Sequence, residues 1–419
     1  MRILLLNQFY PPDVAPTGRV LHDLARALVQ RGHDVTVLCS QRAYDGKNRY
    51  AAREVSDGVS IRRIPALGVG RPTLGWKFVD YTSFVIRLIF ALWKVRPTPD
   101  LILALTTPPY VGLLAKITAR LRKCRHAHWV MDVYPDVMVA HKMIRQNSRL
   151  NRFLGDLTYW EMKGSCLTLC LGPDMATRVR RYCDPGRRKG VKPAAATDWP
   201  AVHWLPLWAD GGIMPWPKDT ANSLREARGW GPGELVLMYS GNMGLGHRIE
   251  EYLEAAARLR GDRSVRWVFA GGGIRRRDVE RFREQTPGLN LELLPYVGAA
   301  ELRAHLCSAD VHLASLETSW SGCMIPSKIQ GIFGVGKPVI YVGAQDSSIA
   351  SWTRESGAGW VIPENDVEAL LRAIAEARSP LERERRGVAA RAYAEKHFDM
   401  NRNCARICEL VEGIVGPAA

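Results

Sequence analysis

Residues 331–340, GIFGVGKPVI, come within one residue of a phosphate-binding loop of the P-loop type. Such a loop reads Gly, four residues, Gly, Lys and then Ser or Thr, whose hydroxyl binds magnesium, and a helix follows it. Gly331, Gly336 and Lys337 fit this spacing, but Pro338 stands where the hydroxyl is needed. The β-branched and aromatic residues that follow predict a strand, and the residues before it favour a short helix. This order is the reverse of a P-loop, so the sequence does not predict ATP hydrolysis.

Two glycine-rich loops in the second half of the chain could bring a ligand close to the backbone. The first, YSGNMGLGH (239–247), lies between a predicted strand and a predicted helix, where backbone amide groups attract phosphate. Asn242 and His247 could donate hydrogen bonds to a diphosphate, although His247 also fits a simple helix-entry position. The second loop, FAGGG (269–273), fits either tight packing of a strand against a helix or a nucleotide base lying on the backbone. The candidate binding residues of the two loops are Gly241, Asn242, Gly244, His247, Gly271 and Gly272.

Two predicted helix starts carry further groups suited to phosphate. Gly18 and Arg19 lie at the first helix, where Arg19 could pair with phosphate, although a lone glycine there is also typical of an ordinary turn. Ser327 and Lys328 lie at the start of the helix before residues 331–340. There the hydroxyl, the positive charge and the helix dipole could act on one phosphate.

Two aspartates follow a predicted strand in the first half of the chain. Asp132 and Asp136 belong to MDVYPDV (131–137) and could bind sugar hydroxyls or act as an acid and base pair. A helix cap and a turn explain them at least as well. Both are candidates for catalysis.

The composition favours an anionic partner. The formal net charge is +16 and the pI is near 9.6, which fits a nucleic acid, a nucleotide or an anionic membrane surface, with a generally basic soluble surface as the simpler alternative. The nine cysteines show no CxxC spacing and no nearby His cluster. We therefore expect reduced thiols and no metal site.

Buried strands alternate with helical stretches in both halves, which predicts an α/β fold with two doubly wound, Rossmann-like domains facing a cleft. The expected strands are 2–8, 34–40, 59–64, 100–106, 126–132, 166–172, 235–240, 266–271, 291–296, 310–315, 338–343 and 359–363. The expected division is an N-terminal domain (1–206), a linker (207–220), a C-terminal domain (221–398) and a C-terminal helix (399–419) that packs back toward the N-terminal domain.

Residues 76–95, WKFVDYTSFVIRLIFALWKV, are strongly apolar but carry charges on one narrow stripe of a helix: Lys77, Asp80, Arg87 and Lys94. The uninterrupted apolar run is too short to cross a bilayer, and Arg87 would lie in its middle. The helix could instead lie at a bilayer interface, with Phe84 and Trp93 in the lipid. A domain helix buried on most sides is an equal alternative.

In their order and spacing these segments resemble the family 4 retaining glycosyltransferases of the GT-B fold, near the branch of the N-acetylfucosaminyl and related transferases of bacterial surface-polysaccharide pathways. The resemblance covers nearly the whole chain. It rests on NQFYPPD with TG at the first helix, DVYPD, YSGNMGLGH, GGG, LPYV, SADVHLASL, PSKIQGIFGVGKPVI and GAGWVIPENDVEAL. In this family GKPVI is the turn from a nucleotide-contacting helix into the next strand, which makes Lys337 structural and Lys328 the expected phosphate contact.

The resemblance implies that the first domain holds the acceptor and the second the donor. Many members bind the donor ribose through the second of two glutamates, but here Gly331 takes that place, with Gln330 beside it. The ribose contact stays open, and Gln330 is a candidate. The expected diphosphate ligands are Asn242, His247, Ser327 and Lys328. The expected catalytic residues are Asp132, Asp136, His247 and Lys328.

The implied activity is that of a retaining, hexosyltransferase-type enzyme of bacterial polysaccharide or glycoconjugate synthesis. It transfers a sugar from a nucleotide diphosphate sugar to an acceptor hydroxyl, and a UDP-sugar is the first candidate for the donor. We expect no obligatory metal or other cofactor. The expected partners are the donor, a sugar or lipid-linked acceptor and an anionic membrane surface, but no nucleic acid. The protein is expected in the cytoplasm, attached peripherally to the inner face of the cell membrane if the acceptor is lipid-linked. A nucleotide-sugar epimerase of the same fold stays an alternative, as does an NAD-dependent Rossmann oxidoreductase, although the GxGxxG order of the latter is missing.

Overall fold

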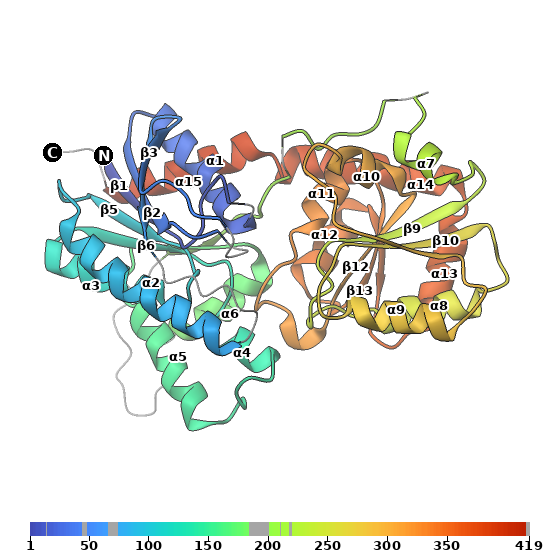
Figure 1. The fold of residues 1–419 in the computed structure, drawn as a ribbon, viewed down its shortest axis with the longest axis horizontal. Helices are drawn as coiled ribbons and strands as arrows, with labels where there is room; N and C mark the ends of the chain where they lie inside the picture. Colours follow the sequence, from blue (N-terminus) through green and yellow to red (C-terminus); the bar gives the residue numbers. More distant parts are fainter. Residues whose placement is uncertain are drawn as a thin grey trace. The chain divides into compact units, whose positions relative to one another are not determined.

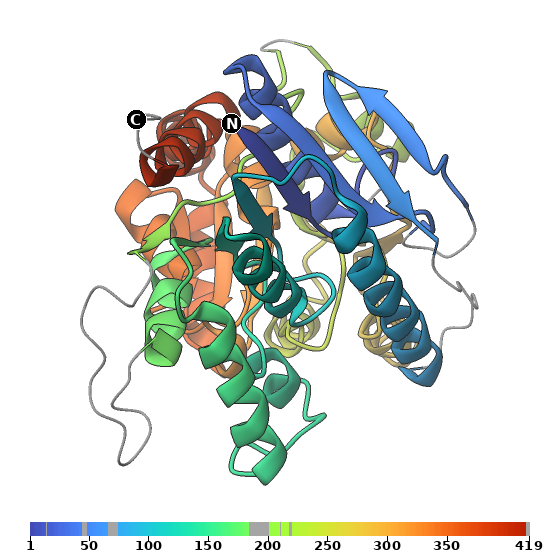
Figure 2. The ribbon, with the colours of Figure 1, turned by 90° about the vertical axis from the view of Figure 1, so that its left-hand side faces the viewer.

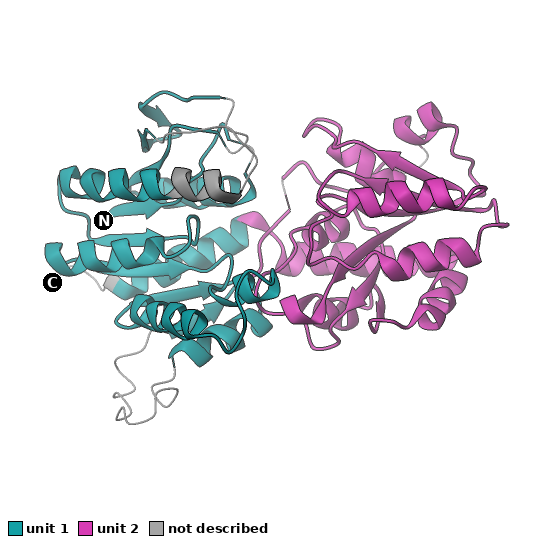
Figure 3. Ribbon diagram, turned by 60° about the horizontal axis from the view of Figure 1, so that its bottom comes forward, with its two compact units in different colours: residues 1–205, 401–419 teal, residues 206–400 magenta. Residues whose placement is uncertain are grey.

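The computed structural model describes residues 1–13, 15–43, 48–65, 74–183, 201–209, 211–217 and 220–415, with the backbone alone for 74–81 and 415. The chain divides into two compact units: unit 1 is residues 1–205 with 401–419, and unit 2 is residues 206–400 (Figure 3). Each unit has its own largely parallel sheet with helices packed on it. The predicted α/β fold with two doubly wound domains is confirmed.

Unit 1 is built on an eight-stranded sheet in the order β3-β4-β2-β1-β5-β6-β7-β8, parallel except for the β3–β4 pair. Its strands are β1 (Arg2–Leu6), β2 (Asp34–Ser40), β3 (Arg53–Ser56), β4 (Val59–Ile64), β5 (Leu101–Ala104), β6 (Arg125–Trp129), β7 (Leu167–Cys170) and β8 (Ala201–Trp204). Its helices are α1 (Pro16–Gln30), α2 (Leu74–Lys94), α3 (Val111–Arg122), α4 (Asp136–Ala140), α5 (Arg149–Met162), α6 (Pro173–Cys183) and α15 (Met400–Val415). Figure 1 shows α1 and α15 on one side of this sheet and α2 and α3 on the other.

Unit 2 has a six-stranded sheet in the order β11-β10-β9-β12-β13-β14, and every pair in it is parallel. Its strands are β9 (Leu235–Ser240), β10 (Val265–Ala270), β11 (Leu291–Leu294), β12 (Val311–Leu316), β13 (Val339–Gly343) and β14 (Gly359–Ile362). Its helices are α7 (Ser223–Arg228), α8 (Glu250–Arg258), α9 (Arg276–Gln285), α10 (Leu302–Ser308), α11 (Lys328–Gly334), α12 (Ser348–Ser356), α13 (Val367–Ala377) and α14 (Pro380–His397), with a 3-10 turn at Thr318–Trp320.

The central strand β9 shows why the sequence of unit 2 produces a sheet covered on both faces. Leu235, Leu237 and Tyr239 belong to one buried cluster with α8 and α13, whereas Val236 and Met238 belong to a second cluster. Successive side chains of a strand point to opposite faces, so an unbroken apolar run must be buried on both. The same property made the parallel strands recognisable in the sequence.

Two strands escaped the sequence analysis, and both are short edge strands. β3 is mostly exposed and pairs antiparallel with β4. β8 is partly exposed and pairs with β7 at the other edge. A strand that is covered on neither face needs no continuous apolar run, so its sequence carries little signal.

Helix α2 packs one apolar face against the sheet of unit 1. Phe84, Leu88 and Leu92 are buried with Leu4 and Ile102 in one core cluster. Figure 2 shows α2, α3 and α5 next to one another along this unit, and α3 packs against both α2 and α5. Phe84, expected to enter a bilayer, is therefore a core residue, and that expectation was wrong. Among the described residues, no helix is long and apolar enough to span a membrane.

The C-terminal helix α15 belongs to unit 1, where Glu412 fastens it to the end of α1 and the turn after it. Arg31 donates two hydrogen bonds to the Glu412 carboxylate at 2.8 and 2.7 Å, and His33 Nε2 lies 2.9 Å from it. These hydrogen bonds, that of Arg31 above all, hold the pKa of Glu412 at about 2, well below its usual 4.5. The contact ties the last helix to the first.

Glu412→Gln should loosen this attachment in a pH-dependent way. Because the pKa is depressed, the carboxylate stabilises the fold above pH 4.5 and ceases to do so as the pH falls toward 2. The contact is partly open to solvent, so we expect a loss of about 1 kcal/mol of unfolding free energy at neutral pH. Denaturant titrations at neutral and acid pH measure the loss and its disappearance. The matched control is Glu409→Gln, which breaks the exposed Arg406 pair of the same helix; equal effects of the two variants would contradict the anchoring role.

Candidate functional site

The candidate residues of unit 2 follow the carboxyl ends of neighbouring strands. β10, β9 and β12 lie side by side in the parallel sheet, so their carboxyl ends meet at one edge. Gly241 and Asn242 come directly after β9, and Gly271 comes directly after β10. Lys328 opens α11, which follows β12. The topology therefore brings predicted residues from three parts of the chain together.

Lys328 reaches across to the loop after β9. Its Nζ lies 3.6 Å from the centre of the Tyr239 ring, donates a hydrogen bond to the Tyr239 hydroxyl and donates another to the backbone oxygen of Asn242 at 3.2 Å. Gly241 has a φ of 121°, and a Cβ atom there would lie 3.0 Å from Lys328 Cε. The glycine therefore makes room for the lysine.

The ammonium group of Lys328 has polar partners but no carboxylate partner among the residues that the structure describes. Burial lowers its pKa well below the usual value, although part of the side chain stays open to solvent. A half-buried cation with only neutral oxygen partners is poorly stabilised, and an anion of the ligand can supply the missing charge.

His247 is held as a neutral imidazole beside this cation. Its Nδ1 lies 2.6 Å from the backbone oxygen of Ser315, and because a carbonyl only accepts, Nδ1 carries the proton. Burial, reinforced by the charge of Lys328, lowers the pKa of His247 to about 3. Nε2 is then an acceptor, which suits a sugar hydroxyl better than a phosphate oxygen.

The glycines of the two loops are explained by contact between the loops. A Cβ atom on Gly271 would clash with the backbone oxygen of Gly241, and one on Gly272 would meet the Tyr296 ring. On Gly244 it would lie 3.2 Å from the Asn242 side chain. The Tyr296 hydroxyl lies 3.4 Å from Asn242 Oδ1. Because these glycines have no side chain, the two loops can pack closely around Asn242.

Two arginines after β10 brace these loops. Arg275 donates to the backbone oxygen of His247 at 2.7 Å and pairs with Glu250. Arg276 donates to the backbone oxygens of Gly271 and Leu294. Three consecutive arginines, RRR (275–277), ordinarily indicate a solvated face, but Arg275 and Arg276 instead bind carbonyl groups of these loops. The three consecutive arginines in the sequence could not reveal these contacts, because only the folded loops bring the backbone oxygens within reach of the guanidinium groups.

The two other predicted residues near α11 differ in accessibility. Ser327 is exposed and lies just before the helix. Gln330 is only 2% exposed, and its Oε1 has no hydrogen-bond partner in the described part of the chain. A ribose contact through Gln330 stays a prediction.

In unit 1, Gly18 and Arg19 lie in the first turn of α1. Gly18 packs against the loop after β1, where a Cβ atom would lie 3.0 Å from the backbone oxygen of Phe9. Arg19 is exposed. Asn7 and Gln8 lie beside them and were not predicted as site residues. Their buried Oδ1 and Oε1 atoms have no hydrogen-bond partner among the described residues.

The two predicted aspartates of unit 1 have different surroundings. Asp132 follows β6 and lines a small pocket with Tyr110, Thr158 and Glu161, and its backbone amide donates to the Thr106 hydroxyl. Burial raises the pKa of Asp132 to about 6. No ion pair engages its carboxylate within the described ranges, so it can accept a hydrogen bond from a ligand.

Asp136, by contrast, is occupied by the protein itself. Arg178 donates to its carboxylate at 2.7 Å, and the Tyr182 hydroxyl also donates to it. Both partners come from α6, so Asp136 joins α4 to α6. This arrangement favours the structural alternative for Asp136 over a role in catalysis.

Comparisons with known families match the two units separately. Residues 17–188 match the glycosyl transferase 4-like domain, and residues 234–379 match the glycosyl transferases group 1. The first match lies within unit 1 and the second within unit 2.

Two relatives carry related names. The chain is 23% identical over 408 residues to WcaI of Escherichia coli (strain K12), named as a colanic acid biosynthesis glycosyl transferase, with 95% of this chain and 97% of WcaI covered. It is 25% identical over 281 residues to WbjE of Pseudomonas aeruginosa, named as a glycosyltransferase, with 66% of each chain covered.

Solved structures share the fold over nearly the whole chain. Sucrose-phosphate synthase from Thermosynechococcus elongatus has a TM-score of 0.74 at 15% identity, with both chains covered to 100%. HepE of Anabaena, solved with UDP and glucose, has a TM-score of 0.68 at 13% identity, covering 98% of this chain and 99% of HepE. WaaG, a glycosyltransferase involved in lipopolysaccharide biosynthesis, has a TM-score of 0.69 at 14% identity, covering 99% of this chain and 100% of WaaG. The chain therefore belongs to the family 4 glycosyltransferases, with a glycosyl transferase 4-like domain and a group 1 domain on the GT-B fold.

Proposed function

We propose that this glycosyltransferase moves a sugar from a nucleotide diphosphate donor to an acceptor hydroxyl with retention of configuration. The first candidate for the donor is a UDP-sugar. The observation that carries the proposal is the half-buried Lys328 ammonium, which has no carboxylate partner among the described residues. The complex of HepE with UDP and glucose supports the choice of UDP. The name of WcaI supports a place in bacterial polysaccharide or glycoconjugate synthesis.

In the proposed reaction Lys328 stabilises the leaving group. The bond between the anomeric carbon and the diphosphate oxygen breaks, and its electron pair stays on the diphosphate. A positive group fixed beside that oxygen stabilises the developing charge more than the ground state, which is what accelerates the step. Tyr239 and the Asn242 backbone hold Nζ in place, and Ser327 is proposed to donate to the same diphosphate.

Retention is proposed to need no protein nucleophile. The acceptor oxygen bonds to the anomeric carbon on the face that the diphosphate leaves, and the hydroxyl proton passes to a diphosphate oxygen. His247 is proposed to orient the donor sugar by accepting a hydrogen bond from one of its hydroxyls at Nε2. This role replaces the predicted donation to phosphate, because the imidazole is neutral. No metal is assigned a role.

Asp132 of unit 1 is proposed to bind the acceptor. Asp132 is a half-buried residue that lines a small pocket beside polar groups, and its carboxylate forms no ion pair within the described ranges. A carboxylate that accepts a hydrogen bond from a neighbouring hydroxyl of the acceptor sugar positions the acceptor, while the reacting hydroxyl passes its proton to the diphosphate. Asp136 takes no part in the proposed chemistry.

The first test is calorimetric titration with UDP, GDP and ADP, with and without magnesium. We expect UDP to bind without the metal. Lys328→Met should weaken UDP binding about tenfold to a hundredfold, because a charged hydrogen bond to phosphate is lost. The variant should fold normally, since it also removes a half-buried charge.

Lys337→Met is the matched control for this variant. Lys337 lies before β13, at the opposite end of the strands from Lys328, and burial likewise lowers its pKa. Its replacement should leave UDP affinity unchanged. Equal UDP affinity of wild type and Lys328→Met would remove Lys328 from the donor site and take the main support from the proposal.

The raised pKa of Asp132 predicts that the rate of sugar transfer depends on pH. Because its pKa is raised to about 6, the carboxylate form that binds the acceptor is lost as the pH falls below that value. The kcat/KM for the acceptor should therefore rise through about pH 6 in the wild type, and Asp132→Asn should lower it about a hundredfold and flatten the profile. Asp136→Asn should lower the melting temperature without moving the inflection. An unchanged inflection in Asp132→Asn would assign the titration to another group.

A further inference from the structure

Helix α2 is apolar on two opposite sides, and only one of them is buried. The buried side packs on the sheet through Phe84, Leu88 and Leu92. The other side faces outward, with Phe90 64% and Trp93 66% exposed. Its members recur at helical spacing, so they form one stripe: Ile86, Ile89, Phe90 and Trp93. A solvent-facing helix side would ordinarily be polar.

The apolar stripe continues onto the neighbouring helix α3. Ile117 and Leu121 are one turn apart on α3 and are 54% and 65% exposed. Of the eighteen large apolar side chains exposed in the described part of the chain, six lie on these two packed helices. Such clustering of large exposed apolar residues marks an interaction surface rather than ordinary scatter.

The same two helices and the strands around them are strongly basic. Residues 82–131 contain eight Lys or Arg residues and a single Asp. That residue, Asp100, is engaged by Arg2 through its backbone amide and its guanidinium. Arg87 and Lys94 are exposed on α2, one residue away from Ile86 and Trp93 respectively. The partner of this surface must therefore offer both apolar groups and negative charge.

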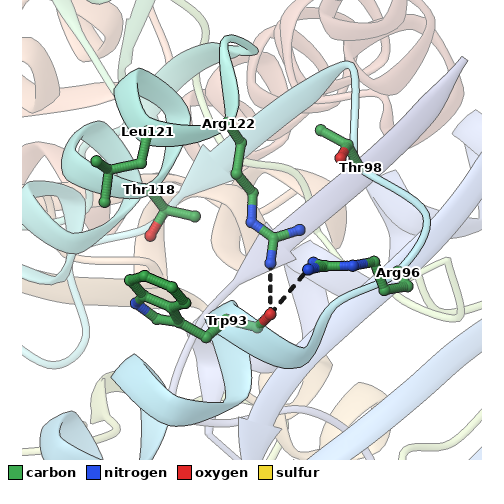
Figure 4. Close-up of a pocket in the computed structure, with 6 residues that line it drawn as sticks. All are labelled: Trp93, Arg96, Thr98, Thr118, Leu121 and Arg122. Atoms are coloured by element: carbon green, nitrogen blue, oxygen red, sulfur yellow. Dashed lines mark hydrogen bonds between the residues drawn. The ribbon is translucent and has the colours of Figure 1, made fainter.

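A pocket with two arginines opens between the end of α2 and α3 (Figure 4). Its volume is about 480 Å³, and it is lined by Trp93, Arg96, Thr98, Thr118, Leu121 and Arg122. Arg96 and Arg122 both donate to the backbone oxygen of Trp93, at 3.2 and 2.6 Å. No ion pair involves either guanidinium among the described residues. Two like charges share one carbonyl, with Trp93 and Leu121 on the rim.

We propose that α2 and α3 form a docking surface for an anionic phospholipid bilayer, with the Arg96–Arg122 pocket holding a lipid phosphate. The apolar stripe would enter the interface between headgroups and acyl chains, and the basic residues would face the headgroups. A second copy of the chain is a poorer occupant, because a symmetric pair would set two equally basic surfaces against each other. The proposal goes beyond the proposed reaction and does not depend on it.

The test is flotation of the full-length protein with phosphatidylglycerol-containing vesicles and with pure phosphatidylcholine vesicles. We expect binding to the anionic vesicles alone. Phe90→Ser with Trp93→Ser should weaken it by about a hundredfold, since two large apolar groups no longer leave water. Lys94→Gln with Arg96→Gln should weaken it by about twenty-fivefold, given about fivefold for each charge.

Matched controls lie on unit 2. Leu381 and Val388 of α14 are 74% and 65% exposed, so Leu381→Ser with Val388→Ser removes the same kind of surface elsewhere. Arg277→Gln with Arg281→Gln removes two exposed charges of α9. Both pairs should leave vesicle binding unchanged. The melting temperature and the far-UV circular dichroism spectrum of every variant check that it is folded.

Several outcomes would overturn the proposal. Absence of wild-type binding to anionic vesicles would do so, as would equal loss in the control pairs. If the wild type binds inorganic phosphate but not vesicles, and Arg96→Gln abolishes the phosphate binding, the pocket is a site for a free anion. Two further outcomes would assign the surface to another partner, in each case if the wild type does not bind vesicles. If the protein is a dimer that Phe90→Ser with Trp93→Ser dissociates, the partner is a second copy of the chain. If the protein binds RNA and Lys94→Gln with Arg96→Gln abolishes that binding, the partner is RNA.

Discussion

The chemistry proposed for unit 2 depends on one ammonium group that neutral oxygens hold in place. Lys328 lies against the Tyr239 ring and donates to the Tyr239 hydroxyl and the Asn242 backbone oxygen. None of these partners supplies the negative charge that would offset burial of the cation. The protein thus keeps a positive group oriented before any ligand arrives, at the expense of a lowered pKa. A diphosphate that enters there meets a charge that needs no rearrangement.

The parallel sheet is what makes this arrangement possible. In such a sheet all strands end at the same edge, so loops after β9 and β10 and the helix after β12 converge, although they are far apart in sequence. Close contact between the two loops then requires glycine at Gly271, and the approach of the Lys328 side chain requires it at Gly241. Unit 1 follows the same rule with Asp132 after β6. Helix α2 differs from an ordinary helix that covers a sheet, because the side facing away from the sheet is also apolar.

Much of the fold could be predicted because buried parallel strands have a strong sequence signal. The long apolar strands were found, whereas the short edge strands β3 and β8 were not. The roles of individual side chains were harder, since they depend on partners that are distant in sequence. Asp132 and Asp136 look alike in MDVYPDV, yet only Asp136 meets Arg178 and Tyr182 of α6. The neutral state of His247 depends on the Ser315 carbonyl. Likewise, no pattern within 76–95 distinguished the core residue Phe84 from the exposed Trp93.

The most direct test of the central claim is the number of protons taken up when UDP binds. Calorimetry in buffers of different ionisation enthalpy measures it, at about pH 8 and above, where the diphosphate itself is fully ionised. Burial lowers the pKa of Lys328, and a bound diphosphate should raise it again, so the wild type should take up protons on binding UDP as the pH rises toward the range where the free lysine titrates, and Lys328→Met should take up none. Equal uptake by the two proteins, or none by either, would contradict the account, because the diphosphate would then not be neutralising this buried charge.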